Sequence, residues 1–523
     1  MAVFTVAMMR LGRVSVWLLA LQMGAAGIAC AQVDVAADPP SARDAAAPSV
    51  LSLSVREALQ GALTRAVAIQ TQQLDVAQQR AQTEQAAHEF LPQTVLSSQL
   101  ERNSASATGT AATRGTTLSG SLTSSWKLRS GTPLALTEGR QYDRNGQVAQ
   151  GDGIDPAVNP TASNRVRSLS LTQPLLRGAG GDVVLLNERR AALALAIARS
   201  GFLQTQRDVV LGGVAAYFGL EQAQQNVALA QAALKRAAEA RSINEELLAT
   251  GRISRIALLQ SDADVAQAEL ALMQARQAEN VARRQLLRAI GRYDLDADRT
   301  DVRLTDTFTA YLPQETRDAG AVMREALARR VDLELAAAAV KEGGFAVTEA
   351  DDGLRNQLDL TVRRDRSGAS VGGAATRGAN LAVGLSFSMA LDKSANRLAS
   401  SAARVALRKA ELSRTDLERT ARTEVGDALK NIDFAFLQYR LAQRSAGLAR
   451  QRLDAEIEKT RAGRSSGTDL SLAQDALNQT LSQEVQARYA IFTAQLELQR
   501  VSGTVLEQWR VPSLAGDSAL PAL

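Results

Sequence analysis

The sequence contains one long internal repeat without gaps. Residues 246–291 match residues 458–503 at a constant offset of 212 positions, and 14 of the 46 aligned pairs are identical. Repetition on this scale constrains the architecture more than any local pattern, because both copies must adopt the same supersecondary structure. The sequence therefore predicts two copies of one long helix-turn-helix. The predicted turns share the pairs Gly251 and Gly463, Arg252 and Arg464, and Ser254 and Ser466.

A shorter repeat precedes each predicted hairpin. The segment Val55–Leu59 returns as Met323–Leu327, 268 positions later, so the first copy holds roughly 56 extra residues. This surplus falls near 103–165, where Gly, Ser, Thr and Asn are frequent, as in loops and strand hairpins. We predict an internal duplication with two structural repeats and a tail, which cover residues 51–315, 316–510 and 511–523.

The N-terminus has the form of a secretory signal over residues 1–31. Its apolar stretch is short for a transmembrane helix, and Ala29-Cys30-Ala31 has the small residues of a cleavage site. Cys30, the only cysteine, either leaves with the signal or accepts a lipid; Gly27, in place of the usual Leu, favours removal. An Ala- and Pro-rich segment follows over 32–50. We expect an exported protein.

Proline is absent from two very long segments. None of the 11 prolines lies between Pro174 and Pro313 or between Pro313 and Pro512, and proline breaks helix interiors. A helix over 183–249 would reach roughly 100 Å at about 1.5 Å per residue, with Gly212-Gly213 as the place for a bend. Heptad rows of apolar and small residues predict coiled-coil packing. In the first return helix these rows are Leu258, Val265, Leu272 and Leu286, and Ser261, Ala268, Ala275, Ala282 and Ala289.

Alternating segments predict strands with one apolar face. In 381–391 large apolar residues alternate with small or polar ones, and 118–128 has a similar pattern. This pattern fits a barrel strand between lipid and water; for a soluble sandwich the strands are too few and too scattered among helices. Two to six strands from one chain cannot enclose a wide lumen, so other subunits must contribute. Shorter alternating segments lie at 94–102, 132–140, 165–173 and 358–364.

Composition and motifs argue against nucleic-acid binding and catalysis. The formal charge of +5 comes from 60 basic and 55 acidic residues spread along the chain, which is not a nucleic-acid-binding pattern. His88 is the only histidine, and no nucleophile-base pair, metal cluster or phosphate loop is visible. Gly178–Gly181 and Gly343-Gly344 lack the context of a phosphate site, and Asp351-Asp352 is interpreted as a solvated helix end. We predict no enzyme activity, no catalytic or metal-binding residue and no cofactor.

Four features follow one another along residues 51–510: Leu53–Leu59, Phe90–Pro92, Leu169–Gly178 and the Gly-x-x-Ser turns at Gly251 and Gly463. In these features and their order the chain resembles TolC-type outer-membrane efflux proteins. The resemblance implies an α+β membrane protein, in which a long antiparallel α-helical barrel of coiled-coil hairpins continues a transmembrane β-barrel shared by a trimer.

Two features depart from the family pattern. The first half has four candidate strands where the family has two, so 129–164 is an added hairpin, an extracellular loop or an extension of the preceding strand. In the second half, Gln357 replaces the Pro that often precedes the strand.

The resemblance also implies a function. It is that of an outer-membrane channel subunit of a tripartite efflux or type I secretion system: a homotrimeric passive export duct across the outer membrane and periplasm of a Gram-negative bacterium. The expected partners are outer-membrane lipid, a periplasmic adaptor (membrane fusion) protein and, through it, an inner-membrane transporter, but no nucleic acid. The alternative is a periplasmic coiled-coil scaffold without a pore, which would wash off membranes without detergent.

Two kinds of site residue are predicted. The turns would form a periplasmic tip that docks the adaptor. A tight turn explains their Gly and Ser residues, because Gly suits the end of a helix, and Ser254, and Thr468 or Ser466, suit caps of the return helices. It does not explain the Arg in each turn. Asp469 lies at the offset where the family has acidic residues that constrict the lumen; the alternative is a first-turn acid favoured by the helix dipole. The next acidic position of the family holds Leu472, and the first-half equivalent of Asp469 is Ala257. The tip residues are Gly251, Arg252, Ser254, Gly463, Arg464 and Ser466.

Overall fold

The computed structural model describes most of the chain after its N-terminal segment. The described ranges are 49–105, 112–148, 161–295, 300–308, 318–371, 374–462, 464–465 and 467–512. All of them belong to the unit Ser49–Leu523. The predicted signal with Cys30, most of the predicted tail, and the turn residues Gly463 and Ser466 lie outside the described ranges.

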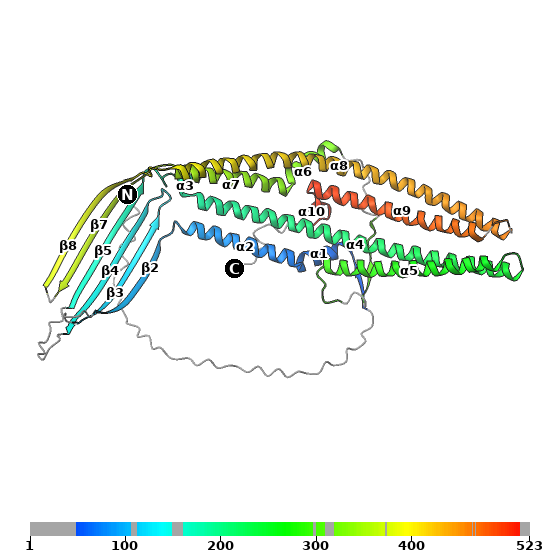
Figure 1. The fold of residues 1–523 in the computed structure, drawn as a ribbon, viewed down its shortest axis with the longest axis horizontal. Coiled ribbons are helices and arrows are strands. Elements are labelled where there is room, and N and C mark those ends of the chain that lie inside the picture. The colour runs from blue at the N-terminus through cyan, green and yellow to red at the C-terminus, as the bar shows by residue number, and fades with distance from the viewer. Residues whose placement is uncertain are drawn as a thin grey trace, which may run out of the picture. The chain divides into compact units, whose positions relative to one another are not determined.

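Six strands form one antiparallel sheet (Figure 1). In order across the sheet they are β2 (Gln93–Ala105), β3 (Ala112–Lys127), β4 (Pro133–Val148), β5 (Thr161–Pro174), β7 (Gln357–Val371) and β8 (Ala374–Ser388). Each contains one of the six predicted alternating segments or most of it, so the alternation is confirmed as strand. β8 ends at Ser388, before the predicted end at residue 391, and β7 begins at Gln357 itself.

The open question at 129–164 is answered by an added hairpin. β3 and β4 pair over their whole lengths, from Lys127 opposite Pro133 to Ala112 opposite Val148. The turn between them closes through a hydrogen bond of 2.9 Å from the amide of Leu128 to the carbonyl of Thr132. The first half of the chain therefore contributes four strands and the second half two.

Ten helices are described. They are α1 (Val55–Arg65), α2 (Val67–His88), α3 (Gly181–Val184), α4 (Leu186–Ala249), α5 (Arg255–Ala289), α6 (Ala319–Arg329), α7 (Val331–Gly353), α8 (Ser394–Arg461), α9 (Gly467–Ser502) and α10 (Val505–Gln508).

The long helix predicted over 183–249 is found as α4, preceded by the separate α3. With 64 residues, α4 spans roughly 96 Å, and it continues without interruption through Gly212-Gly213. At Gly213 a Cβ atom would lie 3.2 Å from Leu59 of α1. This glycine therefore serves the close approach of two helices.

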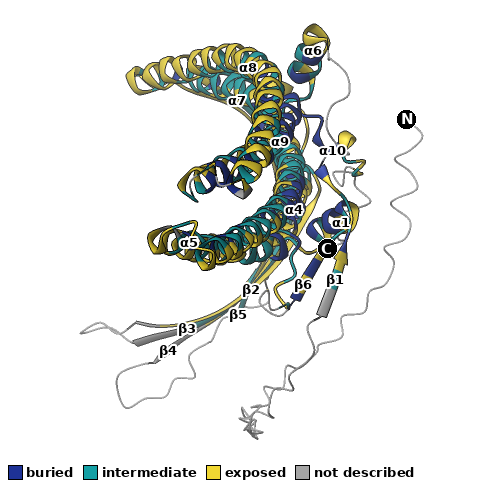
Figure 2. Ribbon diagram, turned by 90° about the vertical axis from the view of Figure 1, so that its right-hand side faces the viewer, coloured by how far each residue is buried: buried dark blue, intermediate teal, exposed yellow. Residues whose placement is uncertain are grey.

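The helices form one curved layer (Figure 2). In the half next to the sheet the order of contacting helices is α8, α7, α4, α2, and in the other half it is α8, α9, α4, α5. The predicted heptad rows are buried to different degrees in the two return helices. Leu258, Val265 and Leu272 of α5 are half-buried, whereas Leu470, Leu477 and Leu498 of α9 are buried.

A short parallel pair of strands, absent from the sequence analysis, lies beside the middle of the layer. β1 (Ser49–Leu53) pairs with β6 (Thr300–Leu304). The hydroxyl of Tyr217 on α4 donates to the carbonyl of Leu53 at 2.9 Å and accepts from the amide of Thr305 at 3.2 Å. Tyr217 belongs to the largest buried cluster, with Phe218, Phe308 and Phe492.

The two copies of the short repeat occupy different places in their helices. Val55 is the first residue of α1, behind a capping box in which Ser54 and Glu57 satisfy each other's backbone amides. α6 begins at Ala319, four residues before Met323. Aligned by their structures, α1 and α6 are offset by about one helical turn from the sequence match, which keeps the same face buried. The duplication itself stays a prediction.

Candidate functional site

The sheet has one apolar face and one polar face. Residues directly opposite each other in an antiparallel pair lie on the same face, and the register places Leu122 opposite Leu96 and Leu134 opposite Leu171. Small polar residues line the other face, where Ser97 lies opposite Ser121. A shallow hollow of about 360 Å³ lies mostly on this polar face. The arrangement suits lipid on one side and water on the other.

The sheet and the helical layer each end in two free borders. β2 and β8 are the outer strands of the sheet. α8 forms one border of the helical layer, and α2 and then α5 form the other. α2 leads into β2 and β8 leads into α8. Each border therefore runs from sheet to helices along the whole described unit.

The turn between α4 and α5 is a closed helix end. Gly251 has φ +69°, which only glycine adopts without strain. The amide of Gly251 donates to the carbonyl of Leu248 at 2.9 Å and that of Arg252 to the carbonyl of Leu247 at 2.9 Å, as in a Schellman motif. This backbone arrangement directs the exposed Arg252 to the outside.

The turn between α8 and α9 repeats the same backbone bond. The amide of Arg464 donates to the carbonyl of Lys459 at 2.9 Å, the equivalent of the bond from Arg252, and Arg464 is exposed. The Ser465 hydroxyl makes a short hydrogen bond to Glu456, which lowers the pKa of that carboxyl, as does Lys459.

The predicted capping roles of the turn residues are met only in part. Ser254 is the N-cap residue of α5, but its hydroxyl makes no capping hydrogen bond. α9 begins at Gly467, so Thr468 lies inside its first turn and the alternative that Thr468 caps α9 is wrong. Asp469 lies exposed in the same first turn, and Leu472 is 55% exposed on α9.

A cleft between the two hairpins, lined by both apolar and polar side chains, was not predicted from the sequence. It has a volume of about 340 Å³ and is lined by α4, α5 and α9. Arg236 of α4 donates to Oδ1 of Asn478 on α9 at 2.5 Å, which links the hairpins. Asp264 and Asp475 both line the cleft, and burial together with the charge of Asp264 raises the pKa of Asp475. The sequence gives only one indication of Arg236 and Asp475, which is that both residues lie outside the predicted heptad rows.

The described ranges contain neither a metal-binding cluster nor a helix that could span a membrane. In these ranges no group of three or more His, Cys, Asp and Glu side chains is arranged to hold a metal ion. None of the helices described combines the length and the apolar character needed to cross a membrane.

Comparison with known proteins identifies the fold. Residues 322–504 match the family profile described as outer membrane efflux protein. CusC, solved as a transmembrane channel, has a TM-score of 0.65 at 15% identity, covering 86% of this chain and 91% of its own. The outer-membrane channel OprN gives 0.64 at 16%, covering 86% and 89%. The CmeC outer-membrane channel of Campylobacter jejuni gives 0.62 at 16%, covering 86% and 85%.

The predicted resemblance to TolC-type outer-membrane efflux proteins is confirmed by the family profile and the shared fold. No curated protein matches this chain.

Proposed function

We propose that this chain, which matches the outer membrane efflux protein family over residues 322–504 and has the fold of solved outer-membrane channels, is one of three subunits of a passive export duct. The joined sheets would cross the outer membrane, and the joined helical layers would continue the duct into the periplasm. The setting would be a tripartite efflux or type I secretion system.

The observation that carries the proposal is the pair of matching free borders. An unpaired outer strand exposes a row of backbone donors and acceptors, and closure into a barrel removes such edges. β8 runs toward the helices and β2 runs away from them, so β8 of one copy can pair antiparallel with β2 of the next. Three copies of this sheet would supply eighteen strands, and barrels of about that number leave an aqueous channel.

Exposed apolar stripes on the border helices support the same closure. On α5, Leu270 and Met273 are 46% and 68% exposed, and on α8, Phe434 and Leu441 are 66% and 60% exposed. They lie on opposite borders of the layer, as head-to-tail contacts in a closed ring require. Heptad spacing is typical of helices that pack against a neighbour. The stripe residues are Ile256, Leu259, Leu270 and Met273 on α5, and Phe434, Leu437, Leu441 and Leu448 on α8; Leu398, Val405 and Leu412 are further exposed apolar residues near the start of α8.

The two turns are proposed as the tip that meets a periplasmic adaptor and, through it, an inner-membrane transporter. Arg252 and Arg464 are exposed at equivalent places in the two copies, and neither is needed to form its turn. Exposed loop residues on a rigid scaffold commonly carry binding. Gly251, Ser254, Gly463 and Ser466 are assigned to the shape of the tip.

The hairpins next to the tip are proposed as the closed part of the duct. The Arg236–Asn478 hydrogen bond ties the first hairpin to the second. Asp469, three copies of which would approach one another in a trimer, would favour cations at the constriction.

The experiment is planar-bilayer recording of the detergent-extracted protein. The proposal expects extraction to require detergent and the purified trimer to give discrete, small, cation-preferring openings. A protein that washes off membranes without detergent and gives no conductance would instead be the periplasmic scaffold.

A further inference from the structure

Arginines are frequent on the apolar face of the sheet, and six of them form a belt across the three strands β4, β5 and β7. We call these six the arginine belt: Arg140 and Arg144 on β4, Arg165 and Arg167 on β5, and Arg364 and Arg366 on β7. Arg102 and Arg377 lie on the same face of the outer strands β2 and β8. Arg140 lies directly opposite Arg165, and Arg167 lies directly opposite Arg366. Because the register continues from Leu136 opposite Leu169, the belt lies on the same face as the large apolar residues.

The belt has little countercharge of its own. Glu138 is the one carboxylate on this face among the described strand residues, and it pairs with Arg165 at 2.5 Å and Arg167 at 3.2 Å. In the ranges that the structure describes, the other four belt arginines form no ion pair. Like charges directly opposite each other destabilise a strand pair. A bound anion would offset this cost.

The excess of positive over negative charge is found on the apolar face only. The polar face carries more acidic than basic residues, so a general excess of arginine in the strands does not explain the belt. The charged residues of the polar face are Glu101, Asp143, Asp359, Asp365, Lys127 and Arg363.

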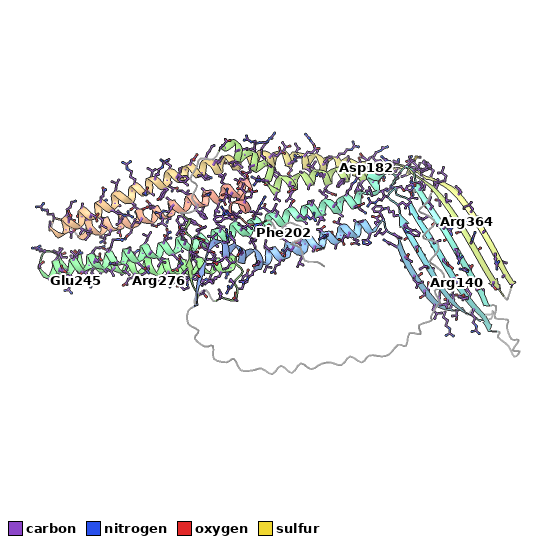
Figure 3. The ribbon with its side chains drawn as sticks, turned by 180° about the vertical axis from the view of Figure 1, so that it is seen from behind. Arg140, Asp182, Phe202, Glu245, Arg276 and Arg364 are labelled. Atoms are coloured by element: carbon purple, nitrogen blue, oxygen red, sulfur yellow. The ribbon has the colours of Figure 1, made fainter. Side chains whose placement is uncertain are left out.

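The belt borders directly on the apolar band. On β7, Leu358, Leu360 and Val362 come first after α7, and Arg364 follows at the next position on that face, roughly 7 Å farther along the strand. β4 and β5 have the same order, with the leucines nearer the helices and the arginines beyond them. Figure 3 labels Arg140 and Arg364, which lie on the sheet away from its junction with the helices. An anion that meets this belt therefore sits next to hydrocarbon, as the headgroup of a lipid does.

We propose that the arginine belt binds the phosphate groups of lipid headgroups in the outer leaflet of the membrane. The assignment to the outer leaflet rests on the proposed function, in which the helices lie in the periplasm. Guanidinium groups bind phosphate oxygens through paired hydrogen bonds, and Arg is preferred over Lys where the geometry is bidentate. Neighbouring belt arginines on adjacent strands can share one headgroup.

The test measures lipid binding to the purified full-chain trimer by native mass spectrometry. The probes are a bisphosphorylated glycolipid, the same glycolipid without its phosphates, and inorganic phosphate as a competitor. The belt variant is R140Q/R144Q/R364Q/R366Q, which leaves the Glu138 cluster intact. A matched variant, R397Q/R419Q/R422Q/R452Q, removes the same charge from exposed positions of α8, and a four-Lys variant of the belt keeps the charge.

The wild type should bind the phosphorylated lipid about tenfold or more tightly than the dephosphorylated one, since each basic residue near a charged lipid surface adds appreciable affinity. The belt variant should lose this preference, the α8 variant should keep it, and the four-Lys belt should keep part of it. Equal binding by the belt variant and the wild type, equal binding of both lipids, or displacement of the lipid by inorganic phosphate would overturn the proposal. Conductance in a neutral bilayer is recorded separately, so loss of the pore and loss of the lipid preference are told apart.

Discussion

The return helices α5 and α9 occupy equivalent places in the two hairpins but meet different surroundings. Both carry the same seam toward their hairpin partners. α9 packs between α8 and α4, and Leu470, Ile491 and Leu498 are almost fully buried. α5 packs mainly on α4 and leaves Ile256 77% exposed. The seam therefore explains how each return helix packs against its own hairpin partner. Whether the other side of the helix is also covered depends on the position of the hairpin in the layer.

The largest expected effect comes from a charge in the α5 stripe. Leu270→Glu should abolish the trimer, because a carboxylate buried at each subunit contact without a partner costs several kcal/mol. Native mass spectrometry or light scattering measures the oligomer. Lys235→Glu, at an exposed position of α4, which forms neither border of the layer, is the control and should leave the trimer intact. A trimer that survives Leu270→Glu would show that α5 is not at the contact.

The second prediction compares the free energy of unfolding after substitution of a buried residue of α9 and of the aligned residue of the border helix α5. Phe492 of α9 is 1% exposed and packs against Phe218 with ring centroids 4.5 Å apart, whereas the aligned residue of α5 is the half-buried Asn280. Phe492→Ala should lower the free energy of unfolding by about 3–5 kcal/mol, and Asn280→Ala should change it little. Thermal and urea unfolding measure both; equal losses would contradict the different burial of the two helices.

A smaller effect is expected where the hairpins meet. Arg236→Ala removes the bond to Asn478 between hairpins, a charge-assisted hydrogen bond that contributes about 1.5–3 kcal/mol. Arg241→Ala removes only contacts within the first hairpin, to Asp262 and Glu245. We expect Arg236→Ala, but not Arg241→Ala, to raise the open probability in bilayer recordings. If both variants open equally, the link between hairpins does not hold the duct closed.

The smallest effect concerns the one acidic residue that distinguishes the second turn from the first. Asp469→Ala should weaken the cation preference, and Ala257→Asp, at the equivalent first-hairpin position, should strengthen it, because in the proposed trimer each would change three charges near the proposed constriction. Reversal potentials under a salt gradient measure both. An unchanged preference in both variants would remove these positions from the constriction.

Much of the fold was predictable because its periods are long and regular. Alternation predicted all six strands of the sheet, and the absence of proline predicted the length of α4. β1 and β6 were missed because five residues are too few for an alternation to stand out from chance, even though β6 alternates between buried and exposed positions. Their pairing also joins Ser49 to Thr300 across the sequence. The sequence match at Met323 placed the start of α6 four residues too late, because a displacement of four residues keeps the same face of a helix buried.

The site was less predictable because its parts depend on pairing. The turns were predictable because Gly251 recurs as Gly463 in the repeat. The arginines of the belt are visible in the sequence, but only the register of β4, β5 and β7 places them on one face. Heptad rows likewise predict a buried face without naming the helix that covers it, which is why the borders and the cleft at Arg236 became visible only in three dimensions.

The central claim is that the two borders of one copy close on the borders of the next. In a Cys30→Ser background, Ser98→Cys on β2 is combined in turn with Leu381→Cys, Val383→Cys and Leu385→Cys on β8, all on the apolar face. After mild oxidation of membranes, the account predicts that at least one combination gives disulfide-linked chains in a ladder that ends at three copies. A ladder that ends at another number, or trimers in which no combination forms a disulfide between chains, would contradict it.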